Sequence, residues 1–163
     1  MKRLILFSNI ILLLLLTACS EDLDYRKACA EKDWPKAYSI VEKYHGIVVD
    51  KNEIWRKKQA DYGTKSRKQQ IAYDNLIFAQ NDYQEAYRYV VLQEAMSELE
   101  QGNLMRIAAI VKEQQASWVY KELIQIAESI GDKELAQKLN DMAQSLNKRQ
   151  TEEAEDNMNA EIP

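Results

Sequence analysis

The chain has 163 residues, a formal net charge of −4, four glycines and two prolines. Its length is enough for one domain with a core, and so few helix breakers argue against a turn-rich β fold. Helix-forming residues dominate and predict an all-α protein, while the mildly acidic balance makes a nucleic-acid partner a poor expectation.

The first residues have the order of a secretory signal. Lys2 and Arg3 precede an apolar run over residues 4–16, which is shorter than the roughly 20 residues of a membrane-spanning helix. The run ends in Leu16-Thr17-Ala18-Cys19, which resembles the lipobox of bacterial lipoproteins. The resemblance implies that residues 1–18 are a signal peptide, cleaved before Cys19, and that the Cys19 thiol carries a lipid. An ordinary signal with a chance cysteine is the alternative.

Ser20 follows the predicted lipidation site. In lipoproteins of the enterobacterial kind, aspartate at this position retains the protein in the inner membrane. The serine therefore implies an outer-membrane anchor facing the periplasm, with the inner membrane as the alternative. Residues 19–27 would form a lipidated tether. Cys29 is then the one cysteine left, so the domain has no internal disulfide. Cys29 is either a buried apolar residue, or it forms an intermolecular disulfide or is a reactive thiol.

The middle of the chain predicts several short helices. Asp33 is a candidate N-cap before Trp34-Pro35, and Gly46 is a candidate C-cap that opens a loop to Asn52. The pairs Asp50/Glu53 and Ser66/Gln69 have the spacing of capping boxes. We expect helices over residues 22–31, 34–45, 51–62, 66–80 and 82–101.

The last third has the clearest periodicity. Asn103 and Ser117 are candidate caps, and Gly131-Asp132 predicts a break. Beyond it, Leu135, Leu139, Met142 and Leu146 form one helical stripe. The apolar pattern then stops, so we expect a helical domain over residues 28–147 and a disordered acidic tail over residues 148–163.

A short motif recurs along the chain. Residues 33–38 and 82–87 both read Asp-aromatic-x-x-Ala-Tyr, and the turns at Gly102-Asn103 and Gly131-Asp132 are looser relatives. The motif resembles the turn and second-helix start of tetratricopeptide hairpins, and it implies a short array of antiparallel helical hairpins. The recurrences do not keep that family's period of about 34 residues, so a helical bundle with ordinary capping turns is the alternative.

Two groups of side chains are candidate contact residues. In a tetratricopeptide-like array, tyrosines would line a peptide-binding groove, and the alternative is that they are core or boundary residues. A segment with a net charge of +5 over residues 56–68 would bind anionic lipids or an acidic partner, unless it is a solvated turn. The tyrosines are Tyr73, Tyr83, Tyr87, Tyr89 and Tyr120, and the basic residues are Arg56, Lys57, Lys58, Lys65, Arg67 and Lys68.

The residues for catalysis are missing from the sequence. His45 is the one histidine and is expected at a helix end, and no cysteine or histidine cluster has the spacing of a metal site. We therefore expect no enzyme, no cofactor and no metal. The expected function is that of an outer-membrane lipoprotein that acts as an interaction or assembly factor, for example a pilotin or an accessory of a secretion, pilus or conjugation system. A lipoprotein that binds anionic lipid or cell wall through residues 56–68 is the alternative.

Overall fold

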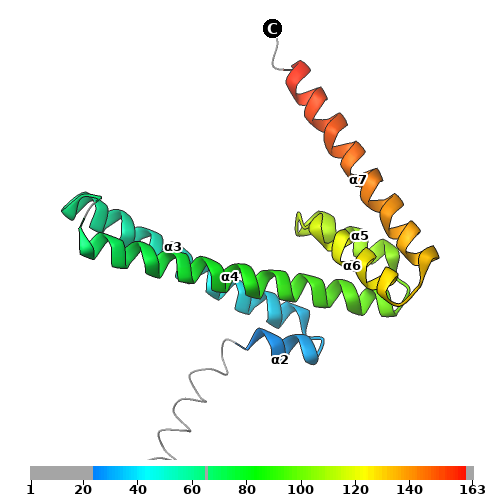
Figure 1. Cartoon of the computed structure of the whole chain (residues 1–163), viewed down its shortest axis with the longest axis horizontal. Coiled ribbons are helices and arrows are strands. Elements are labelled where there is room, and N and C mark those ends of the chain that lie inside the picture. Colours follow the sequence, from blue (N-terminus) through cyan, green and yellow to red (C-terminus); the bar gives the residue numbers. More distant parts are fainter. Residues whose placement is uncertain (1–23, 65, 161–163) are drawn as a thin grey trace, which may run out of the picture. The chain divides into compact units, whose positions relative to one another are not determined.

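The computed structural model describes residues 24–64 and 66–160, apart from the side chains of residues 150 and 153–160. Within these residues every regular element is an α-helix, which confirms the predicted all-α fold. None of these helices is both long enough and apolar enough to cross a membrane. The predicted signal peptide, Cys19 and Ser20 lie outside the described residues. The helices are α2 (Tyr25–Ala30), α3 (Trp34–Tyr62), α4 (Arg67–Glu100), α5 (Leu104–Glu113), α6 (Trp118–Ser129) and α7 (Lys133–Ala160) (Figure 1).

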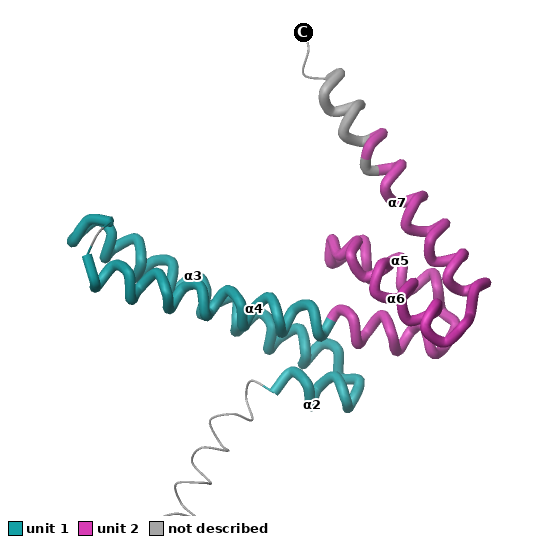
Figure 2. Tube along the Cα trace, viewed as in Figure 1, with its two compact units in different colours: residues 1–90 teal, residues 91–163 magenta. Residues whose placement is uncertain are grey.

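The chain divides into two compact units, and the boundary falls inside α4 (Figure 2). The first unit ends at Val90 and contains α2, α3 and the first two thirds of α4. The second unit begins at Val91 and contains the rest of α4 with α5, α6 and α7.

The first unit is built on an antiparallel hairpin of α3 and α4. The rings of His45 and Tyr83 lie 5.3 Å apart, and ten residues further along α3 the ring of Trp55 lies 6.0 Å from that of Tyr73. In the part of α4 that belongs to the first unit, buried residues are three, four or seven positions apart, which is the spacing of a coiled coil. Every seventh residue is an alanine, and these small side chains let the two helices approach closely. The buried residues are Gln69, Ala72, Leu76, Ala79, Ala86 and Val90.

The short helix α2 covers the base of this hairpin. Tyr25, Ala28 and Cys29 are buried in one apolar cluster with residues of both long helices, including Ile40 and Ala86. Cys29 is buried, in line with its interpretation as an apolar core residue. The cluster is the core of the first unit.

The second unit has a core of large aliphatic side chains. Five side chains of this core have an exposed fraction of 1% or less. They are Ile107 and Ile110 of α5, Val119 and Leu123 of α6, and Leu139 of α7. The predicted stripe is confirmed, since Leu139 is buried and Leu135, Met142 and Leu146 are half-buried.

Three turns between helices have the same construction. A residue with positive φ ends the first helix, namely Lys32, Gly102 or Gly131. The next residue donates its backbone N–H to the carbonyl five residues earlier, as in a Schellman motif. Its side chain then caps the following helix. These caps are Asp33, Asn103 and Asp132, which accept hydrogen bonds from the backbone N–H groups of Lys36, Arg106 and Leu135. The predictions of caps at Asp33 and Asn103 and of a break at Gly131-Asp132 are confirmed. The cap predicted at Ser117 is wrong, because the Ser117 side chain makes no capping hydrogen bond at the start of α6.

Two predicted breaks are wrong. The helix α3 continues through Gly46 to Tyr62, so the loop to Asn52 and the capping box at Asp50 do not form. The helix α4 continues through Asn81-Asp82, so Asp82 is a mid-helix residue although it matches Asp33 in the motif. A mid-helix glycine costs about 1 kcal/mol, and the coiled-coil packing along both helices outweighs it.

The start of α4 and the end of α7 also bear on the predictions. Ser66 Oγ accepts a hydrogen bond from the Gln69 backbone N–H at 3.1 Å, which confirms this cap. At the other end, α7 runs to Ala160, through residues expected to be disordered. A Lys148–Glu152 ion pair at 3.7 Å supports the helix there. The prediction of disorder relied on the loss of the apolar stripe. Oppositely charged residues at i and i+4 can stabilise a helix that has no such stripe.

Candidate interaction surface

The tyrosines predicted to line a groove fall into separate groups. Tyr83 and Tyr87 stack with ring centroids 6.1 Å apart, and Tyr83 also contacts His45. Tyr89 instead packs edge-on against Tyr25 of α2 at 5.5 Å. Burial raises the pKa of Tyr87. These three are half-buried boundary residues of the first unit.

The other two predicted tyrosines differ in exposure. Tyr73 is exposed on α4 and contacts the indole of Trp55. Tyr120 is 3% exposed, and its side chain packs in the core of the second unit, where burial raises its pKa. The buried position of Tyr120 leaves little of its ring for a partner.

The basic segment lies where α3 ends and α4 begins, at the tip of the hairpin. The ammonium groups of Lys58 and Lys68 lie 5.4 Å and 4.6 Å from the ring centroid of Tyr62, as in cation–π contacts. Lys57 pairs with Glu53 at 2.6 Å. Arg56 and Arg67 are exposed, and Lys65 lies outside the described residues. The structure thus gathers cations around Tyr62, a residue the sequence analysis did not single out.

The hairpin also exposes large apolar side chains that the sequence analysis missed. Four of them form what we term the open strip: Ile47, Ile54, Ile71 and Phe78, with exposed fractions of 37%, 45%, 51% and 67%. Ile47 and Ile54 are seven residues apart on α3, and Ile71 and Phe78 are seven apart on α4. In a coiled coil this spacing keeps side chains on one line along the helix. The seven-residue spacing was the available signal, and it became meaningful only once α3 and α4 proved continuous.

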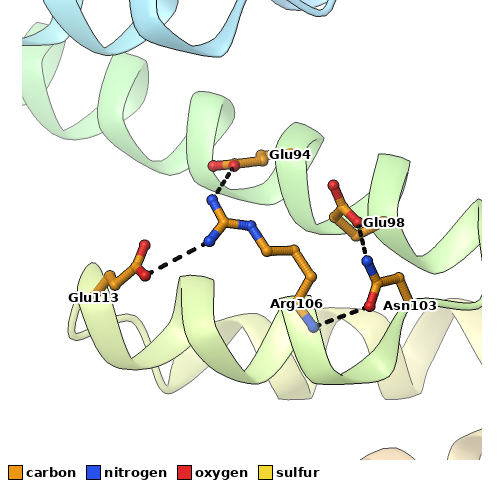
Figure 3. Close-up of polar contacts among 5 residues, drawn as sticks. All are labelled: Glu94, Glu98, Asn103, Arg106 and Glu113. Carbon is orange, nitrogen blue, oxygen red and sulfur yellow. Dashed lines mark hydrogen bonds and ion pairs between the residues drawn. The ribbon is translucent and has the colours of Figure 1, made fainter.

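A polar cluster holds α4 and α5 together in the second unit (Figure 3). The Arg106 guanidinium donates a hydrogen bond to the buried carboxylate of Glu94 at 3.3 Å and lies 3.6 Å from Glu113. Asn103 donates its side-chain amide N–H to Glu98 at 2.9 Å. We interpret the Glu94–Arg106 pair as a structural contact, because the carboxylate and the guanidinium bind each other within the second unit.

The described residues hold no cluster of three or more histidine, cysteine, aspartate or glutamate side chains arranged for a metal ion. His45 lies in the middle of α3, so the prediction that it ends a helix is wrong. A pocket of about 360 Å³ between α6 and α7 is lined by residues that include Trp118, Ile124 and Leu146.

In comparisons with known proteins, no family model, no curated protein and no solved structure matches the chain.

Proposed function

We propose that this protein is an outer-membrane lipoprotein, anchored through Cys19 and facing the periplasm, that acts as a non-enzymatic interaction or assembly factor in the bacterial envelope. The anchor rests on the resemblance of Leu16-Thr17-Ala18-Cys19 to a lipobox and on Ser20 after it. Lipid chains contribute about 0.8 kcal/mol per buried methylene, so a multiply acylated cysteine holds the protein at the membrane without help from the helices.

The observation that supports an interaction role is the exposed apolar surface of the α3–α4 hairpin. Phe78 and Ile71 are more than half exposed, in line with each other on one helix. Scattered exposed apolar residues are ordinary, whereas aligned ones mark contact surfaces. A helical scaffold that holds such a line rigidly is suited to binding another protein.

The lipid anchor is tested by Cys19→Ser in the full-length chain. The substitution removes the thiol that carries the lipid, so the protein should no longer incorporate labelled fatty acid, should retain its signal peptide and should leave the outer-membrane fraction. Ser20→Asp, with Cys19 intact, is the matched control and should move the lipidated protein to the inner membrane. A Cys19→Ser protein that is still processed and recovered in the outer membrane would refute the anchor.

A second candidate function is the binding of anionic lipid head groups by the hairpin tip. It is favoured by the placement of Lys58 and Lys68 around the exposed Tyr62. Cations next to an aromatic ring suit a membrane surface, and such binding is weakened by salt. Changing Lys57, Lys58, Lys65, Arg67 and Lys68 to Gln should then abolish binding to anionic vesicles. Unchanged binding of this variant would rule the candidate out.

A further inference from the structure

At the base of the hairpin, α2 packs on the same face of α3 and α4 that carries the open strip further along. Tyr25 of α2 donates its hydroxyl to Glu85 at 3.3 Å, and its ring meets that of Tyr44 at 6.1 Å. Ile40, in the same apolar cluster, is 3% exposed. On α3, Ile47 and Ile54 lie one and two heptads after Ile40. On α4, Phe78 and Ile71 lie one and two heptads before Glu85. Because the helices are antiparallel, both series run from α2 toward the tip on the same face.

The exposed fractions along this line change where α2 ends. Ile40 is covered, whereas Ile47 and Ile54 reach 37% and 45%. The six residues of α2 span roughly 9 Å, and two heptads of α3 extend roughly 21 Å beyond Ile40. The face packs a helix at its base, and α2 is too short to cover most of its length.

The adjoining part of this chain has the wrong composition to cover the strip. Ser20, Glu21, Asp22 and Leu23 precede the N-cap of α2, and one of these four side chains is apolar. These four residues therefore do not supply an apolar helix for the strip.

The charges beside the strip indicate what kind of helix fits. Lys57 follows Ile54 by three residues and Lys68 precedes Ile71 by three, so both cations flank the strip at its tip end. Lys57 also pairs with Glu53, and at the other end of the strip the acids Asp74 and Asp82 lie close to Phe78 in sequence. The segment over residues 56–68 carries a net charge of +5 in sequence. A second copy packed tip to tip would bring an equal positive charge, whereas acidic side chains beside an apolar stripe would complement it.

From this placement we propose that the open strip binds an amphipathic helix of a partner protein, with acidic residues flanking its apolar stripe, laid along the hairpin in line with α2. The inference rests on the proposed function and names the class of partner. Binding of a helix in a groove uses apolar anchors at i, i+3, i+4 and i+7, and Ile47/Phe78 and Ile54/Ile71 form two successive levels that such anchors would contact.

The test measures peptide binding to the full-length protein in detergent by fluorescence anisotropy. The probe is a synthetic helix of about 16 residues, which spans roughly 24 Å, with leucines on one face and glutamates beside them. A second peptide has every glutamate replaced by lysine. The double variant Ile54→Ser/Phe78→Ser removes two strip residues, and Val49→Ser/Ile77→Ser is the matched control, because these two side chains are exposed but lie outside the strip.

The proposal predicts that the acidic peptide binds and that the strip variant weakens it about tenfold or more, the loss expected for one large apolar anchor. The control variant should bind like the wild type, and the lysine peptide should bind at least about tenfold more weakly. Circular dichroism melts of both variants should match the wild type, since all four positions are exposed.

Three results would overturn the proposal. The first is equal binding by the strip variant and the control. The second is no peptide binding together with anionic-vesicle binding that the strip variant loses, which assigns the strip to the membrane. The third is a wild-type dimer in analytical ultracentrifugation that the strip variant dissociates, which assigns it to a second copy. Incorporation of labelled fatty acid at Cys19 is measured in a separate experiment, so a failed peptide test would not contradict the proposed lipid anchor.

Discussion

Glu94 illustrates how single residues hold the second unit together. Its side chain is 6% exposed on α4, and the Arg106 guanidinium of α5 reaches it across the turn that Asn103 caps. A buried carboxylate is costly unless cations or hydrogen bonds compensate it. The contact thus ties α5 to α4 just after the turn between them.

Arg106→Met should lower the free energy of unfolding by about 1–3 kcal/mol, because it removes a charged hydrogen-bond partner of a buried carboxylate. Urea denaturation monitored by circular dichroism measures the change. Lys138→Met is the control, since the Lys138–Glu134 pair is exposed on α7 and should contribute little. Equal effects of the two substitutions would show that the Glu94–Arg106 contact contributes no more to stability than an exposed ion pair does.

Tyr44 makes the first unit sensitive to alkaline pH. Burial raises its pKa above the ordinary value near 10, and the negative charges of Asp82 and Glu85 add to the effect. The folded chain then holds this proton more tightly than the unfolded chain does. The contribution is complete below about pH 10 and is lost as the pH rises through the folded pKa. Tm should fall over this range, and Tyr44→Phe should flatten the fall. Parallel curves for the two proteins would contradict the assignment.

At the scale of elements, local chemistry was predictable and helix length was not. Asp33, Ser66 and Asn103 cap helices because a short polar side chain at a helix start can accept a hydrogen bond from a backbone N–H group of the first turn. Gly46 and Asp82 carry similar local signals and sit inside continuous helices. What decides between them is packing against the opposite helix, which a single segment of sequence does not contain.

The glycines give a direct test of this distinction. Gly46→Ala should raise the free energy of unfolding by about 0.5–1 kcal/mol, because the position is helical and an added Cβ meets nothing within 4 Å. Gly102→Ala should lower it by about 1–2 kcal/mol, because Gly102 has φ +72° at a helix C-terminus. Chemical denaturation of both variants measures the two changes. The same sign for both would mean that α3 is not continuous through Gly46.

At the scale of the whole molecule, the fold class followed from composition, whereas the candidate site did not. The tyrosines were chosen for their residue type, and the structure distributes them among exposed, boundary and core positions, with Tyr73 exposed and Tyr120 buried. The open strip depends on the register of α3 against α4. Ile54 and Ile71 come to the same face only because the chain turns back between them, and sixteen residues of intervening sequence hide that relation.

The central claim is that the open strip is where this protein binds a partner, and crosslinking in living cells tests it most directly. A photo-crosslinking amino acid is placed at position 78 in the strip or at position 84, an exposed polar position on the same helix. The account predicts one discrete adduct from position 78, lost when Ile54→Ser is added, and none from position 84. Equal adducts from both positions, or none from position 78, would contradict it.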